Sequence, residues 1–204
     1  MARAFRRKGE RVVARLDEAE RLIVAGLMEQ TRALLAPEIA STGDPFADLI
    51  ASLESSVAAA EGMPRGTDPG DRDPALARLL PDAHRGDPRV AAEFRRLTEQ
   101  DLRRRKADSL TVAIDVLRGV TEGDRDRVRL DKASADAFLV ALTDTRLLIG
   151  ERLGLRTEED VEALEVHLRA DPEDPVAYAA AVYDFLTWLQ DSLVGALLGR
   201  WTLP

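Results

Sequence analysis

The chain has no cysteine, few aromatic residues and two histidines. Without cysteine it can form no disulfide, zinc–thiolate site or thiol redox switch. With 4% aromatic residues, a core must be filled by Leu, Ala and Val. His84 and His167 each lack a second histidine at metal-ligand spacing, and no glycine-rich phosphate loop, G-x-S-x-G or H-E-x-x-H motif occurs. We therefore expect no enzyme, no bound metal and no cofactor.

Long uninterrupted apolar runs are also missing. The basic N-terminus lacks the apolar stretch of a secretory signal, and the most apolar region, 175–199, contains Asp184, Gln190 and Asp191. We expect no membrane association and a cytoplasmic protein. The net charge of -8 argues against a globally basic nucleic-acid binder, although a local basic face remains possible.

Helix-start signals dominate the remaining sequence. Asp-Pro steps at Asp44, Asp87 and Asp174 predict three long helices, the second ending near Gly119, and Thr157 begins a short one. Five of the ten prolines fall between residues 62 and 88. We predict one mainly α domain over 1–204, a helical bundle, with a flexible basic arm at 1–9 and a Pro-rich loop at 62–87 that holds one helical turn at 74–80.

Two segments predict strands, 10–17 and 126–131, and each leads directly into a helix. The sequences of 15–35 and 129–149 match in outline at an offset of 114 residues, with Asp17 and Asp131 in the N-cap position of the helix that follows. The pattern indicates two strand–cap–helix units whose strands pair into a two-stranded ribbon. The alternative is chance similarity between helices of similar composition.

The segment 93–106, EFRRLTEQDLRRRK, concentrates basic residues within an acidic chain. Helical geometry directs Val90, Phe94 and Leu97 inward, so an outward basic stripe is predicted. Its members are Arg89, Arg96, Arg103 and Arg104, to which the N-terminal arm adds Arg6 and Arg7. The stripe either confers solubility or contacts phosphates or an acidic partner.

The same geometry places Asp101 and Arg105 on the apolar side, and Arg146 lies among leucines with Arg32 in the matching place of the first unit. Buried charges require partners, and Asp101, Asp144 and Asp184 are the candidate carboxylates. These residues form either a buried ion-pair network that holds the helices together or an anion pocket lined by Arg32, Arg105 and Arg146.

The last predicted helix is apolar around most of its circumference. Such a helix is either central to a bundle or faces a second copy of the chain, so a homodimer stays open.

Three segments together resemble one known family: DPALARLLPDAHRGDPRVAAEFRRLTEQDLRRRK, FLVALTDTRLLIGERLG and VYDFLTWLQDSLVGAL. The chain is similar to the actinomycete domain-of-unknown-function family DUF2017, whose genes typically neighbour that of the ClpS protease adaptor. The family includes the AosR type, regarded as an oxidative-stress-sensing transcriptional regulator that works with an alternative sigma factor. The resemblance implies DNA or a sigma factor as partner and a cysteine pair as sensor, which this chain lacks.

From the resemblance we expect a non-enzymatic regulator of transcription that acts through the basic stripe on DNA or a sigma factor. Two alternatives are a protein-interaction module linked to ClpS-dependent proteolysis and a small-anion binder.

Overall fold

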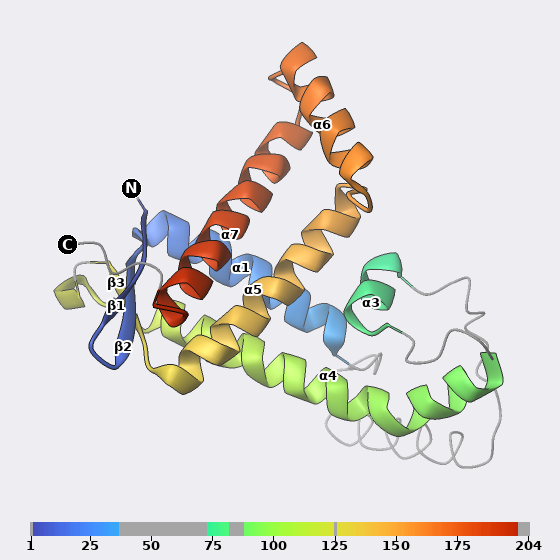
Figure 1. Cartoon of the computed structure of the whole chain (residues 1–204), viewed down its shortest axis with the longest axis horizontal. Helices are drawn as coiled ribbons and strands as arrows, with labels where there is room; N and C mark the ends of the chain where they lie inside the picture. The colour runs from blue at the N-terminus through green and yellow to red at the C-terminus, as the bar shows by residue number, and fades with distance from the viewer. Residues whose placement is uncertain (1, 37–72, 82–87, 125, 200–204) are drawn as a thin grey trace, which may run out of the picture.

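The computed structural model describes residues 2–36, 73–81, 88–124 and 126–199. The fold is mainly helical with a small antiparallel sheet at one end, as predicted (Figure 1). The sheet has three strands where two were predicted. None of the helices in these ranges combines the length and the hydropathy that a membrane span requires.

The additional strand is formed by the N-terminal residues. β1 (Arg3–Lys8) pairs antiparallel with β2 (Arg11–Arg15), which pairs antiparallel with β3 (Arg127–Leu130). The expectation of a flexible arm at 1–9 is therefore wrong for β1. Phe5 is 1% exposed, and its backbone N–H donates to the Ser192 hydroxyl at 3.2 Å. One apolar side chain among basic residues gives too weak an alternation to predict a strand, and tertiary burial of Phe5 decides the outcome.

The two predicted strand–cap–helix units are present and face each other. β2 leads into α1 (Glu18–Leu35), and β3 leads into α5 (Lys132–Arg152). In the ribbon Ala14 lies opposite Val128, its equivalent at the offset of 114 residues. Because equivalent residues meet each other, the two units are related by an approximate twofold axis.

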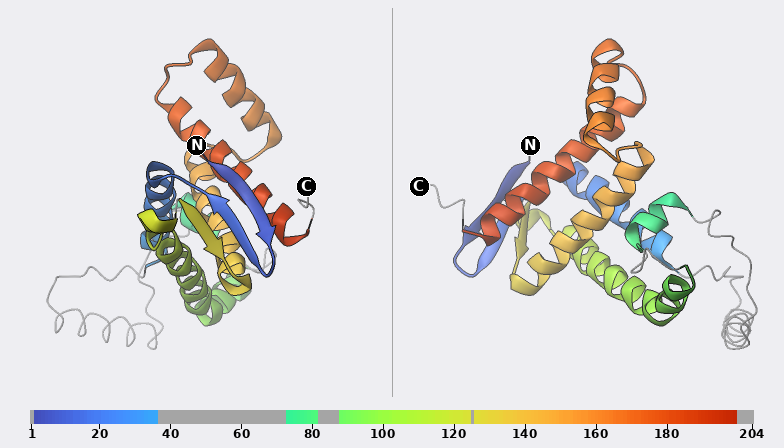
Figure 2. Two further views of the ribbon diagram at one scale, coloured as in Figure 1. Left: turned by 90° about the vertical axis from the view of Figure 1, so that its left-hand side faces the viewer. Right: turned by 45° about the vertical axis from the view of Figure 1, so that its right-hand side comes forward.

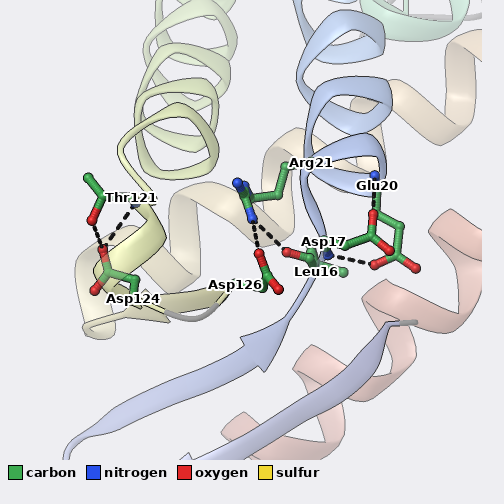
Figure 3. A network of polar contacts seen from close by, with 7 residues as sticks. All are labelled: Leu16, Asp17, Glu20, Arg21, Thr121, Asp124 and Asp126. Atoms are coloured by element: carbon green, nitrogen blue, oxygen red, sulfur yellow. Dashed lines mark hydrogen bonds and ion pairs between the residues drawn. The ribbon is translucent and has the colours of Figure 1, made fainter.

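The turn from strand to helix is held in the same way in both units. Asp17 and Glu20 form a capping box at the start of α1, and Asp131 accepts a hydrogen bond from the Ser134 backbone N–H at the start of α5. Figure 3 shows the first of these caps beside Arg21, which donates to the Leu16 carbonyl at 2.8 Å and to the Asp126 carboxylate at 3.1 Å. The bond to Asp126 ties α1 to the turn that precedes β3.

The core lies between the sheet and four helices. α4 (Pro88–Arg118) matches the predicted helix, packs along α1 and α5, and leads through a 3-10 turn (Glu122–Asp124) to β3. α7 (Val176–Leu197) packs against α5 and β1, and the predicted short α3 (Pro74–Leu79) covers part of α5. The helix predicted from Asp44 lies outside the described residues. The largest fully buried side chains are Phe5, Phe138, Leu16, Met28, Leu35, Leu79, Leu110, Leu117, Leu130, Leu142, Leu186 and Leu189.

The end of α5, α6 (Glu158–Ala170) and the start of α7 form an arm that projects from the core (Figures 1 and 2). The predicted cap is present, since Thr157 and Asp160 form a capping box, and Asp174 accepts from the Val176 backbone N–H at 2.7 Å. α6 has no buried residue. The second half of α7 is central to the core, whereas Trp188 on its side is 39% exposed.

Candidate functional site

The basic stripe predicted on α4 is divided in the structure. Arg103 forms an ion pair with Glu99 at 2.7 Å and donates to the Leu35 carbonyl at 3.3 Å, at the C-terminal end of α1. The last carbonyls of a helix have no intrahelical donor, and the Arg103 guanidinium supplies one. Arg103 is therefore engaged within the protein. Arg104 is exposed and pairs with the equally exposed Asp101 at 3.3 Å. The side chains of Arg89 and Arg96 lie outside the described residues.

The interior arginines bind neutral partners. Arg32 donates to the Thr111 hydroxyl of α4 at 3.1 Å. Arg146 donates to the Gln190 side-chain carbonyl of α7 at 2.7 Å, and its guanidinium carbon lies 5.2 Å from the centre of the Tyr183 ring. Because one arginine joins α1 to α4 and the other joins α5 to α7, these contacts do not bring the two together in one pocket.

The predicted burial of three charged residues is wrong, since Asp101, Arg105 and Asp184 are exposed. The inward face of α4 was assigned from apolar residues at its start, but Leu97 is 63% exposed. The face that packs on the core instead includes Leu110, and Asp101 lies on the same side of the helix as Leu97. Asp184 lies on the polar side of α7 and is exposed.

A buried ion pair in the described part of the chain joins a different set of residues. Lys106 of α4 pairs with Asp144 of α5, whose side chain is 1% exposed. Burial raises the pKa of Asp144, although the ammonium group of Lys106 acts in the opposite direction. The Oδ2 atom of Asp144 is buried without a hydrogen-bond partner among the described residues. Asp144 is one of the carboxylates that the sequence offers as partners for the interior arginines, whereas nothing in the sequence distinguishes Lys106 from the three arginines that precede it.

A second group of basic residues gathers on the sheet. The three strands hold eight basic residues and no acidic one: Arg3, Arg6, Arg7, Lys8, Arg11, Arg15, Arg127 and Arg129. Arg6 and Arg7, both predicted to bind a partner, are exposed on β1. Arg129 forms an ion pair with Asp124, and this hydrogen bond is the main reason that the pKa of Asp124 falls to about 2. The other seven have no carboxylate within ion-pair distance among the described residues.

The remaining titratable contacts stabilise the arm. His167 and Asp174 lie 2.8 Å apart at the surface, near the end of α6. The Val176 backbone N–H, more than His167, lowers the pKa of Asp174, as expected for a carboxylate that caps a helix. Within the described ranges no group of three or more His, Asp or Glu side chains has the geometry to hold a metal ion. His84 lies outside those ranges.

Comparison with known proteins adds a family and three named relatives. A family model described as domain of unknown function DUF2017 matches residues 2–197. The AosR protein of Mycobacterium leprae (strain TN) is 32% identical over 150 residues, which are 67% of this chain and 64% of the relative. The oxidative stress regulators AosR of Mycobacterium tuberculosis (strain H37Rv) and Mycobacterium bovis are 31% identical over 142 residues, 62% of this chain and 59% of each relative. These matches span less than two thirds of the relatives' lengths, and no solved structure matches.

Proposed function

This chain belongs to the DUF2017 family, and from that premise we propose that it is a non-enzymatic regulator of transcription in a stress response. The observation that carries the proposal is the similarity to the oxidative stress regulators AosR over about two thirds of the chain. The family model supports extending that relationship over nearly the whole chain, since it matches residues 2–197.

The polar contacts of the described residues support binding in preference to catalysis. Thr157 and Asp17 cap helices, Lys106 joins α4 to α5, and Arg146 joins α5 to α7. Each of these groups already serves the fold. The basic side chains of the three strands are different, because in the described part of the chain only Arg129 among them has a carboxylate within ion-pair distance.

The regulator acts by contact with DNA or with a sigma factor through exposed basic residues. On α4, Arg104 and Arg105 are exposed, whereas Arg103 is bound to Glu99 and to the end of α1. Arg6 and Arg7 provide further exposed charge on β1. The signal it responds to is not thiol oxidation of this chain, because no cysteine is present.

The test compares promoter occupancy with transcript levels in the organism that carries the gene. Chromatin immunoprecipitation of the tagged protein is sequenced, and RNA is sequenced from wild-type and deletion strains before and after peroxide treatment. We expect occupancy at promoters whose transcripts change in the deletion strain. Uniform occupancy together with unchanged transcripts would overturn the proposal. Occupancy that follows a co-purified sigma factor would support the protein-mediated route to the same function.

A further inference from the structure

The outer face of the sheet carries basic side chains and no acidic one. Side chains alternate along each strand, and Phe5, Val12, Ala14, Val128 and Leu130 occupy the buried inner face. The opposite side, which we call the basic sheet face, is formed by Arg3, Arg6, Lys8, Arg11, Val13, Arg15, Arg127 and Arg129. Seven positive charges thus gather on one side of three short strands, in a chain whose net charge is -8.

Like charges lie opposite each other on this face. Arg15 is the register partner of both Arg3 and Arg127, and Lys8 is the partner of Arg11. Directly opposite like charges destabilise a pair of strands. Of the seven residues, Arg129 alone has a carboxylate within ion-pair distance among the described residues. A polyanion bound at this face would remove a repulsion that the free protein retains.

The basic sheet face is open and its backbone is held from behind. Figure 2 shows the three strands in front of the helices, with no described element covering them. On the inner side Phe5 packs edge-on against Phe138 of α5, and β1 is bonded to α7 through Ser192. A surface that is already ordered loses little conformational entropy when a partner binds.

We propose that the basic sheet face binds the phosphate backbone of duplex DNA. Neighbouring strands lie about 4.8 Å apart and alternate residues about 7 Å apart, so the charges form a two-dimensional array. A DNA duplex presents roughly one negative charge per 1.7 Å of its axis on two strands, which suits an array better than a single extended peptide does. A symmetric dimer through this face is opposed by charge, because each copy would present the same positive side chains.

The residue types on the basic sheet face also indicate which kinds of contact it lacks. Val13 is its one apolar residue, which gives no anchor for a lipid surface. It holds no aromatic ring and no Asn or Gln, the residues that stack on bases or recognise adenine. Its arginines are of the type that also binds guanine, but their contacts with phosphates position DNA without selecting its sequence. This inference rests on the proposed function and deepens it by naming the partner and the surface.

The experiment uses the full chain and a mixed-sequence DNA duplex labelled with fluorescein. The sheet variant carries Arg6→Thr, Arg15→Thr and Arg127→Thr, one change per strand to a residue that suits strands. The matched control carries Arg78→Gln, Arg152→Gln and Arg169→Gln, which removes the same charge from exposed positions on α3, α5 and α6. Binding is measured by fluorescence polarisation between about 50 and 200 mM salt.

We expect the sheet variant to lose about tenfold or more in affinity and its salt slope to fall by roughly 3, one for each lost phosphate contact. The control variant should stay near wild type. Equal losses in both variants would overturn the inference, because they would reflect net charge alone. Wild-type binding to vesicles of phosphatidylserine and phosphatidylcholine, with none to the duplex, would also overturn it and point to a membrane surface.

A footprint on the wild-type protein keeps the test independent of the variants. Lys8 lies on the basic sheet face, whereas Lys106 is held in its buried ion pair. Acetylation followed by mass spectrometry should show Lys8 protected by the duplex and Lys106 slow to react in either state. An unprotected Lys8 at saturating duplex would overturn the inference. If that happens while promoter occupancy and transcripts still respond, the surface is wrong and the regulatory function stands.

Discussion

Thr31 and Thr145 meet in the buried interior with their hydroxyl oxygens 3.4 Å apart, although 114 residues separate them in the chain. They are equivalent positions of α1 and α5. Ala14 and Val128 meet in the same way in the sheet. The approximate twofold axis therefore passes through both the ribbon and the helix pair, and the internal repeat is a feature of the packing as well as of the sequence.

Replacing both threonines by valine should change stability little. Each hydroxyl has one proton, and each donates to its own helix, Thr31 to the Leu27 carbonyl at 2.9 Å and Thr145 to Ala141 at 2.8 Å. The contact between them adds little, since both protons are already used. We expect Thr31→Val, Thr145→Val and the double variant to lie within about 1 kcal/mol of wild type in urea unfolding. A loss above about 2 kcal/mol in either single variant would contradict this account and show that the contact between the two hydroxyls stabilises the fold.

Breaking the Lys106–Asp144 pair should be costly. Lys106→Met leaves a buried carboxylate without its cation, and we expect a loss of about 3 kcal/mol or more near neutral pH. Adding Asp144→Leu should restore most of that stability, because the charge that needed a partner is gone. Urea unfolding of the two variants and wild type measures both effects. A double variant no better than Lys106→Met would contradict this account.

The same pair predicts a pH dependence. Burial raises the pKa of Asp144 above its ordinary value of 3.8, so the folded state takes up this proton at higher pH than the unfolded state. The stability that this group contributes is complete below pH 3.8 and is lost as pH rises through the folded pKa. In Lys106→Met the pKa of Asp144 should rise further, because the ammonium group that lowers it is gone. Its stability deficit should therefore shrink as pH falls from neutral toward 3.8, while Lys106→Met/Asp144→Leu shows no such trend.

Sequence reasoning succeeded where local signals and burial agree. The caps at Asp17, Asp131 and Thr157, the two ribbon strands and the long helix from Pro88 all depend on neighbouring residues, which a sequence displays directly. The offset of 114 residues added a long-range contact, because equivalent residues of a twofold pair meet each other.

Reasoning from the sequence failed where contacts between residues distant in the chain determine the structure. β1 forms because Phe5 fits against Phe138 and Ser192, and none of these lies near it in the sequence. The inward side of α4 was set from Leu97, which the core does not reach. The basic face of the sheet was not predicted for the same reason. Arg3 and Arg127 lie on one side of the sheet only because β1 is a strand, which the sequence does not indicate.

Phe5 should contribute to stability as a core residue. Phe5→Ala removes a side chain that is 1% exposed and packs edge-on against Phe138, so we expect a loss of about 3–5 kcal/mol. Arg6→Ala on the same strand should change the free energy of unfolding by less than about 0.5 kcal/mol, since that side chain is exposed. Urea unfolding measures both. Equally small losses in Phe5→Ala and Arg6→Ala would instead indicate that residues 1–9 form a flexible arm.

Arg103 should act on the fold and leave DNA binding unchanged. Arg103→Ala removes a donor from the end of α1 and the partner of Glu99, and we expect a loss of about 1 kcal/mol. Arg104→Ala, whose ion pair is exposed, should cost close to nothing. Thermal unfolding gives the first comparison and fluorescence polarisation with duplex DNA the second. A weakened affinity in Arg103→Ala without loss of stability would return this residue to the binding surface.

Removing one charge from the basic sheet face should stabilise the free protein while it weakens DNA binding. Arg15→Thr ends the repulsion with Arg3 and Arg127, and we expect a gain of roughly 0.2–1 kcal/mol per pair at low salt. The gain should shrink near 1 M salt, where the screening length falls to about 3 Å. Arg11→Thr is the matched control. Its charge helps to lower the pKa of Asp131, so removing it gives up an attraction as well as the repulsion from Lys8, and the gain should be smaller. A less stable Arg15→Thr protein with undiminished DNA affinity would show that the facing charges are neither repulsive nor used.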